Sequence, residues 1–145
     1  MILASQSPRR LELMQSMGID PQVMPADIVE ICREDEKPLA LVKRLAQEKA
    51  IAISYKLMEQ PNFEQLNNEI VLAADTIVWT DEGQVFGKPT NAEDAKRMLS
   101  KLSGQTHHVS TGVALRRFKA FKSPSPDGAP AVVAVTFVEN TDGTF

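Results

Sequence analysis

The stretch IVLAADTIVW at residues 70–79 is an almost unbroken run of apolar residues, and it decides the fold. Its aliphatic and β-branched composition is typical of a strand that is buried on both faces of a sheet. Asp75 and Thr76 nevertheless stand at its centre. Because an unpaired carboxylate is costly to bury, we expect Asp75 to have a chemical role. The alternative is that Asp75 caps a bend between two shorter strands.

The N-terminal residues predict a strand followed directly by a helix. Ile2–Ser5 has the composition of a short strand. Ser7 and Pro8 suit the N-cap and the first turn of a helix, and Gly18 suits its end. The residues of this helix that we expect to face the core are Leu11, Met14 and Met17.

Strand and helix patterns continue to alternate up to residue 89. We expect an extended segment at 22–31 with Asp27 and Glu30, a helix from Pro38 to about Leu57, a loop at 58–69, the strand at 70–79, a turn at 80–83 and a second strand at 84–89.

The remaining residues predict one more helix and two strands. The helix has a capping-box pair, Thr90 and Glu93, and ends at Gly104. Its apolar face consists of Ala95, Met98, Leu99 and Leu102. A half-buried strand with Val109, Thr111, Val113 and Leu115, a proline-rich hairpin at 121–130 and a strand at 131–138 complete the chain. This order predicts a single α/β domain over residues 1–145 with a mixed sheet.

The composition is that of an ordinary globular domain. The 145 residues are 43% hydrophobic and 24% charged, which is enough apolar material for one core. The net charge of −3 and the pI near 5.4 disfavour a general nucleic-acid-binding protein. Cys32 is the single cysteine, so we expect a structural thiol in a reducing compartment. We find no leader pattern and no bilayer-length apolar run, and we therefore expect a cytoplasmic protein without membrane contact.

Two adjacent arginines are placed where a helix disfavours cations. Arg9 and Arg10 lie in the first turn of the N-terminal helix, at the positive end of its dipole. An anionic ligand would offset this unfavourable placement. Two solvated arginines on an ordinary helix are the alternative.

Lys49 is the second misplaced cation. At helical spacing it falls in the middle of the apolar face that Leu41, Leu45 and Ile53 form. Its side chain either snorkels along that face or carries its amine to an acidic group.

Two further patterns carry less information. GQVFGKPT at 83–90 resembles a Walker A loop, but it is one residue too short and has Pro89 in place of Ser or Thr, so we exclude that loop. Lys88 then lies shortly before a helix N-terminus. His107 and His108 would point to opposite faces of a strand with no further ligand nearby, and we expect them to be structural.

Six blocks of the chain together form a recognisable pattern: LASQSPRRLEL at 3–13, DIVE at 27–30, RLAQEKA at 44–50, LAADTIVW at 72–79, FGKP at 86–89 and MLSKLSGQTHHVSTGVAL at 98–115. In order and with natural spacing, these blocks resemble the Maf family of nucleoside triphosphate pyrophosphatases. The resemblance implies an elongated, twisted mixed sheet flanked by helices, similar to the inosine triphosphatases. It also implies cleavage of a nucleoside triphosphate between its α and β phosphates, with Mg²⁺ or Mn²⁺ as cofactor.

The same resemblance implies roles for individual residues. Asp75 would be the catalytic residue, and Glu30 and Asp75 would hold the metal. The residues that would bind the substrate are Ser7, Arg9, Arg10, Lys49, Thr76 and Lys88. Arg9 directly after SP and Thr76 directly after the aspartate resemble the subgroup that acts on dTTP and UTP, and modified pyrimidine triphosphates are further candidates. Family members commonly pair, so a homodimer is also expected.

The family continues beyond the last residues of this chain. A further helix and a segment resembling DKAGAYGIQG would follow, whereas this sequence ends at NTDGTF. We therefore expect a Maf-like domain that lacks the C-terminal part of the family fold. A catalytically weak or inactive nucleotide-binding module is the alternative to an enzyme. A nucleic-acid or division-related interaction protein is disfavoured by the acidic pI.

Overall fold

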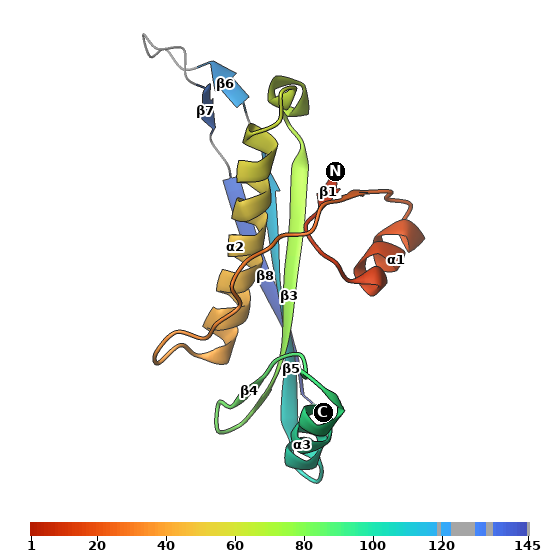
Figure 1. Ribbon diagram of the computed structural model, residues 1–145, viewed down its shortest axis with the longest axis vertical. Helices are drawn as coiled ribbons and strands as arrows, with labels where there is room; N and C mark the ends of the chain where they lie inside the picture. Colours follow the sequence, from red (N-terminus) through yellow and green to blue (C-terminus); the bar gives the residue numbers. More distant parts are fainter. Residues whose placement is uncertain (119, 123–129, 133–134, 145) are drawn as a thin grey trace.

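The computed structural model describes residues 1–118, 120–122, 130–132 and 135–144. Its helices are α1 (Pro8–Ser16), α2 (Pro38–Met58) and α3 (Ala92–Leu102), with a short 3-10 helix, η1, at Phe63–Leu66. Its strands are β1 (Ile2–Leu3), β2 (Gln22–Val23), β3 (Ile70–Thr80), β4 (Val85–Phe86), β5 (His107–Arg117), β6 (Ala120–Lys122), β7 (Pro130–Val132) and β8 (Val135–Thr144). Figure 1 shows an elongated molecule in which α2 runs along the long strands, while α3 lies at the end opposite β6 and β7.

The main sheet is mixed, and β3 lies at its centre. The strand order is β2-β1-β3-β5-β8, and β4 pairs with the C-terminal part of β3. β1 is parallel to β2 and β3, whereas the other pairings in this sheet are antiparallel. β3 and β5 pair from Ile70 opposite Arg117 to Thr80 opposite His107. The prediction of an α/β fold with a mixed, elongated sheet flanked by helices is therefore confirmed.

The two described ends of the proline-rich segment at 121–130 pair with each other, as the predicted hairpin requires. β6 and β7 pair antiparallel, with Ala120 opposite Val132 and Lys122 opposite Pro130. Residues 123–129 between them lie outside the described part of the chain. The single strand predicted at 131–138 corresponds to the end of β7 and the start of β8, and residues 133–134 are likewise not described.

α2 packs on the sheet along most of its length and forms the core with it. Leu41, Val42, Leu45 and Ile77 make one buried cluster at its N-terminal half. The second cluster joins Ala46, Ala50, Ile53 and Leu57 of α2 to Ile2, Ala4, Val71, Ala73, Ala114 and Phe118. The predicted apolar face of Leu41, Leu45 and Ile53 is confirmed, because all three side chains are buried.

Gly112 on β5 lets α2 approach the sheet closely. It pairs with Asp75 of β3. A Cβ at Gly112 would overlap the carbonyl oxygen of Val42 and lie 2.7 Å from its carbonyl carbon. The face of β5 toward α2 consequently consists of the small residues Ser110, Gly112 and Ala114, all buried. The larger residues that revealed the alternation, Val109, Thr111, Val113 and Leu115, are less buried.

Several predicted boundaries in the N-terminal half are too long. The first strand ends at Leu3 rather than Ser5, and only Gln22–Val23 of the extended segment is strand. Only Val85–Phe86 of the predicted second strand pairs with β3. Met17, which was expected in the core, is 61% exposed because it is the C-cap residue where α1 ends.

The start and the apolar face of α3 also differ from the prediction. Asn91 is the N-cap, and its side-chain oxygen accepts from the Asp94 N–H at 2.8 Å. The Asp94 carboxylate accepts in turn from the Thr90 N–H at 3.1 Å. The capping pair is thus shifted by one residue from Thr90 and Glu93. No residue of α3 is buried, and Leu99 on the expected apolar face is 66% exposed.

We expect the Gly112→Ala variant to lose about 1–3 kcal/mol of stability, the usual cost of overpacking a core. The added methyl group meets the backbone of α2, which cannot rotate away as a side chain could. Urea unfolding measures the loss. Gly87→Ala is the control, because a Cβ at Gly87 meets nothing within 4 Å. Equal stability of the Gly112→Ala variant and the wild type would contradict the close approach of α2.

Candidate active site

A cleft of about 1000 Å³ opens where α2, β3 and the loop between β1 and α1 meet the loop between β2 and α2. All but one of the predicted site residues line it: Ser7, Arg10, Glu30, Lys49, Asp75, Thr76 and Lys88. Arg9 is exposed and is not among the lining residues. The fold thus gathers residues from five segments of the sequence at one cleft.

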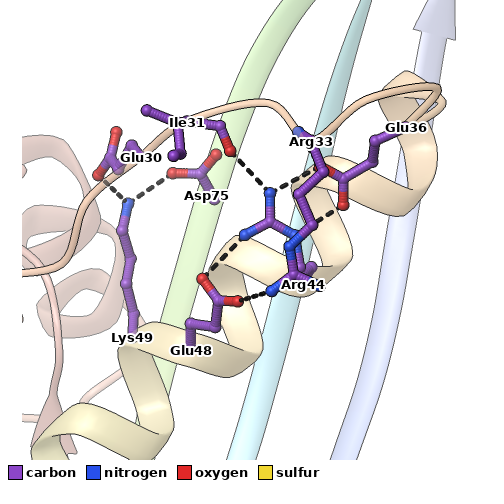
Figure 2. A network of polar contacts seen from close by, with 8 residues as sticks. All are labelled: Glu30, Ile31, Arg33, Glu36, Arg44, Glu48, Lys49 and Asp75. Atoms are coloured by element: carbon purple, nitrogen blue, oxygen red, sulfur yellow. Dashed lines mark hydrogen bonds and ion pairs between the residues drawn. The ribbon is translucent and has the colours of Figure 1, made fainter.

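Lys49 bridges the two carboxylates of the cleft. Its Nζ atom lies 2.5 Å from Asp75 Oδ1 and 2.7 Å from Glu30 Oε1 (Figure 2). Asp75 is 6% exposed within the continuous strand β3, so it does not cap a bend. The Lys49 amine therefore reaches acidic groups instead of snorkelling to solvent. This ion pair supplies the partner that the buried carboxylate requires.

The Arg10 guanidinium lies beside Asp75 in the same cleft. Nη1 donates to Ser5 Oγ at 3.1 Å and to the Ala74 carbonyl at 2.8 Å, and Nη2 donates to Thr76 Oγ1 at 3.0 Å. Burial lowers the pKa of Arg10 from its usual value, while the charges of Asp75 and Glu30 oppose this shift. Arg10 is therefore not a solvated surface arginine.

Two hydroxyl groups that the sequence did not single out help to order this part of the cleft. Ser5 Oγ accepts from the Ser7 N–H at 3.1 Å as well as from Arg10. Thr111 Oγ1 lies 3.0 Å from Thr76 Oγ1, because the two threonines are opposite each other in β3 and β5. Ser7 occupies the N-cap position of α1 but makes no side-chain cap hydrogen bond.

The loop that carries Glu30, residues 24–37, contains neither helix nor strand. Arg44 of α2 contacts it with a two-pronged ion pair, in which Nε and Nη2 each lie 2.6 Å from a Glu36 oxygen. Arg44 Nη2 also donates to the Ile31 carbonyl at 2.8 Å. Glu48 accepts from Arg44 at 2.9 Å and from Arg33 at 2.9 Å (Figure 2). A charged network therefore holds this loop against α2.

The network shifts the pKa values of its two central groups. The hydrogen bonds from Arg44 lower the pKa of Glu36 from 4.5 to about 2, although burial opposes this shift. The hydrogen bonds to Glu36 raise the pKa of Arg44 above its usual range. Both groups are consequently charged at neutral pH.

The carboxylates of the cleft fit a hard divalent cation. Glu30 and Asp75 already contact a single ammonium nitrogen, so their oxygens lie around one cation position. Mg²⁺ and Mn²⁺ prefer oxygen ligands, and Mg²⁺ is usually held by one or two carboxylates together with waters and substrate phosphates. Within the described residues there is no group of three or more His, Cys, Asp or Glu side chains that could hold a metal. Waters or phosphate oxygens would complete the coordination of a cation here.

The other residues considered from sequence are two histidines and a cysteine, and each makes a contact outside the Lys49 cluster. His108 lies 2.5 Å from Asp81 and stacks on Trp79, and His107 Nδ1 lies 3.3 Å from the Gln105 carbonyl. Neither histidine lines the cleft. Cys32 was expected to be a structural thiol, but it is exposed at the cleft. In the described part of the chain, no helix is long and apolar enough to span a membrane.

The low pKa of Glu36 predicts an acid-sensitive contribution to stability. Because this pKa is lower in the folded than in the unfolded chain, the contribution is complete above about pH 4.5 and is lost as the pH falls toward about 2. We therefore expect the difference in unfolding free energy between the wild type and Glu36→Gln to shrink over this range. Urea unfolding at several pH values measures this difference. The pH-dependent contributions of the other carboxylates are common to both proteins and cancel in it. A difference that does not change with pH would contradict the ion pair.

Comparison with known proteins places the chain among named relatives. It is 46% identical over 117 residues to the "dTTP/UTP pyrophosphatase" of Anaeromyxobacter sp. (strain Fw109-5), covering 81% of this chain and 50% of the relative. It is 48% identical over 114 residues to the protein of that name from Citrifermentans bemidjiense, covering 79% and 54%. The protein of that name from Acetivibrio thermocellus is 38% identical over 144 residues, covering 99% and 68%. The chain thus spans about half the length of the first two relatives.

A structural comparison and a family model complete these findings. The Staphylococcus aureus Ham1 protein is 15% identical, with a TM-score of 0.44 over 94% of this chain and 69% of that chain. The family model described as "Maf-like protein" matches residues 1–145. With this match and with relatives up to 48% identical, the chain belongs to the Maf-like protein family.

Proposed function

We propose that this chain hydrolyses dTTP and UTP to the nucleoside monophosphate and pyrophosphate in the cytoplasm. The observation that carries the proposal is the cleft in which Lys49 and Arg10 lie beside the carboxylates of Asp75 and Glu30. The relatives named dTTP/UTP pyrophosphatase support the substrate. Thr76 directly after Asp75, which resembles the pyrimidine subgroup, supports it further.

The proposed triphosphate site is made of cations and of the N-terminus of α1. A triphosphate carries several negative charges, which the guanidinium of Arg10 and the ammonium of Lys88 would neutralise. The loop before α1, with Ser7 at its N-cap, offers backbone N–H groups at the positive end of the helix dipole. In this proposal Arg9, although exposed, contacts the outer part of the nucleotide, and Thr76 contacts its base.

Glu30 and Asp75 would hold the divalent cation of this reaction, because both supply oxygen ligands at one cation position. When bound, Mg²⁺ or Mn²⁺ supplies charge neutralisation for the phosphates. Lys49 would then remain beside the carboxylates as a further positive charge and contact a phosphate oxygen.

Asp75 is the proposed general base. It accepts a proton from the water whose oxygen attacks the α-phosphorus. The bond from the α-phosphorus to the bridging oxygen breaks, and pyrophosphate leaves with the bonding electron pair. Because Asp75 lies in the middle of the long strand β3, its carboxylate is fixed relative to the cleft. Arg10 is held at Ala74, directly beside it, and can stabilise the negative charge that develops in the transition state.

We expect Asp75→Asn to lower turnover by roughly a thousandfold, the typical effect of losing a general base. Its stability should stay close to that of the wild type. The asparagine oxygen can still accept a hydrogen bond from Lys49, and Lys49 retains its ion pair with Glu30. The assay is pyrophosphate release from dTTP and from UTP with Mg²⁺, with unfolding measured on the same samples.

Asp81→Asn is the matched control for this experiment. Asp81 lies in the turn directly after β3 and contacts His108, and it is not among the residues that line the cleft. This variant should release pyrophosphate at the wild-type rate. Near-normal turnover in Asp75→Asn would refute the role of Asp75. Nucleotide binding without pyrophosphate release by the wild type would refute the proposed activity.

A further inference from the structure

Glu30 is held at the cleft by few contacts of its own. Its side chain is 43% exposed, and an ion pair this open to solvent contributes little to stability. The neighbouring Val29 and Ile31 side chains are 74% and 65% exposed, so they do not anchor the loop. Residues 25–32 make no backbone–backbone hydrogen bond with any other described residue. Besides its contact with Lys49, the position of Glu30 therefore depends on contacts on either side of it.

Two contacts flank Glu30. On its N-terminal side, Ile28 packs against the buried cluster of Leu41, Val42, Leu45 and Ile77. On its C-terminal side, the Ile31 carbonyl accepts from Arg44 at 2.8 Å. Ile28 thus supports Glu30 by an apolar contact and Arg44 supports it by a hydrogen bond. The hydrogen bond is made to Ile31, the residue next to Glu30 (Figure 2).

Arg44 is itself firmly placed. Its side chain is 14% exposed, and that of Glu36, which takes both prongs of the guanidinium, is 10% exposed. Glu48, one turn further along α2, contacts the remaining side of the guanidinium at 2.9 Å. Paired hydrogen bonds of this kind fix the orientation of an arginine as well as its charge. A lysine has a single side-chain nitrogen and could not reproduce the two-pronged contact with Glu36.

α2 also carries the partner of Glu30. Lys49 follows Arg44 by five residues, which is about 7.5 Å along a helix. The same rigid helix therefore holds the loop at Ile31 through Arg44 and at Glu30 through Lys49. The first contact is to the backbone and does not depend on what else binds the Glu30 carboxylate.

We propose that Arg44 is a positioning residue that holds Glu30 ready for a divalent cation at the cleft. Arg44 touches neither nucleotide nor cation in this proposal, and it acts through the Ile31 carbonyl and Glu36. The inference rests on the proposed cation site of Glu30 and Asp75, and it does not depend on which nucleotide is hydrolysed.

The experiment compares Arg44→Met with Arg33→Met, the same substitution at the exposed end of the same network. The Arg33 side chain contacts Glu48 and is 64% exposed. Unlike Arg44, it donates no hydrogen bond to the backbone of the described loop. Binding of Mn²⁺ without nucleotide is measured by electron paramagnetic resonance. We expect Arg44→Met to weaken Mn²⁺ binding by roughly 10- to 100-fold, as is usual when a residue that orients a metal ligand is lost. Arg33→Met should bind Mn²⁺ like the wild type.

Hydrogen exchange and a second variant separate positioning from general instability. Arg44→Met leaves the Glu36 carboxylate without its partner, so the double variant Arg44→Met with Glu36→Gln removes that charge as well. In this double variant we expect faster amide exchange at residues 27–36, unchanged exchange in β3 and weakened Mn²⁺ binding. In turnover assays, raised Mn²⁺ concentration should restore most of kcat.

The outcomes distinguish this inference from the proposed function. Wild-type Mn²⁺ affinity in both Arg44 variants would overturn the inference, even if the loop exchanges faster, because Arg44 would then only stabilise the fold. A wild type that binds no Mn²⁺ would overturn it as well. Arg44-dependent Mn²⁺ binding without pyrophosphate release would support the positioning role and contradict the proposed hydrolysis.

Discussion

The ion pair between Lys49 and Asp75 links the core of this protein to its cleft. Asp75 lies at the centre of the most apolar strand, where an unpaired carboxylate would cost several kcal/mol. Its partner comes from α2, which reaches the sheet because Gly112, opposite Asp75 in β5, has no side chain in the way. The close approach of α2 at Gly112 and the charged centre of the cleft therefore both follow from the packing of α2 on the sheet.

The charged side chains of the cleft are arranged so that positive and negative groups stabilise one another. Lys49 pairs with both Asp75 and Glu30, and the charges of these two carboxylates also act on Arg10. Arg10 is held by oxygen atoms of β3 and of the loop between β1 and α1, whereas Glu30 is held by contacts of an irregular loop to α2. The site thus combines side chains on regular elements with Glu30 on an irregular loop.

The sequence predicts the parts of this site that lie on long, regular elements. Asp75 and Lys49 can be recognised from the sequence because each is a charged residue within an apolar pattern, that of β3 or that of α2. Short-range alternatives are harder to separate: Thr90 and Asn91 are both suitable N-caps, and only the backbone selects Asn91. Ser5, Thr111 and the contact of Arg44 with Ile31 depend on strand register and on an irregular loop, for which no periodic signal exists.

A double-mutant cycle on Lys49 and Asp75 tests the central ion pair most directly. Lys49→Met leaves a buried carboxylate without its lysine and should cost about 3–5 kcal/mol of unfolding free energy. Asp75→Asn should cost far less, and the double variant should be more stable than Lys49→Met alone, which gives a large coupling energy. Urea unfolding of the four proteins supplies the cycle. Additive effects, or a Lys49→Met variant as stable as the wild type, would contradict the dependence of the buried carboxylate on Lys49.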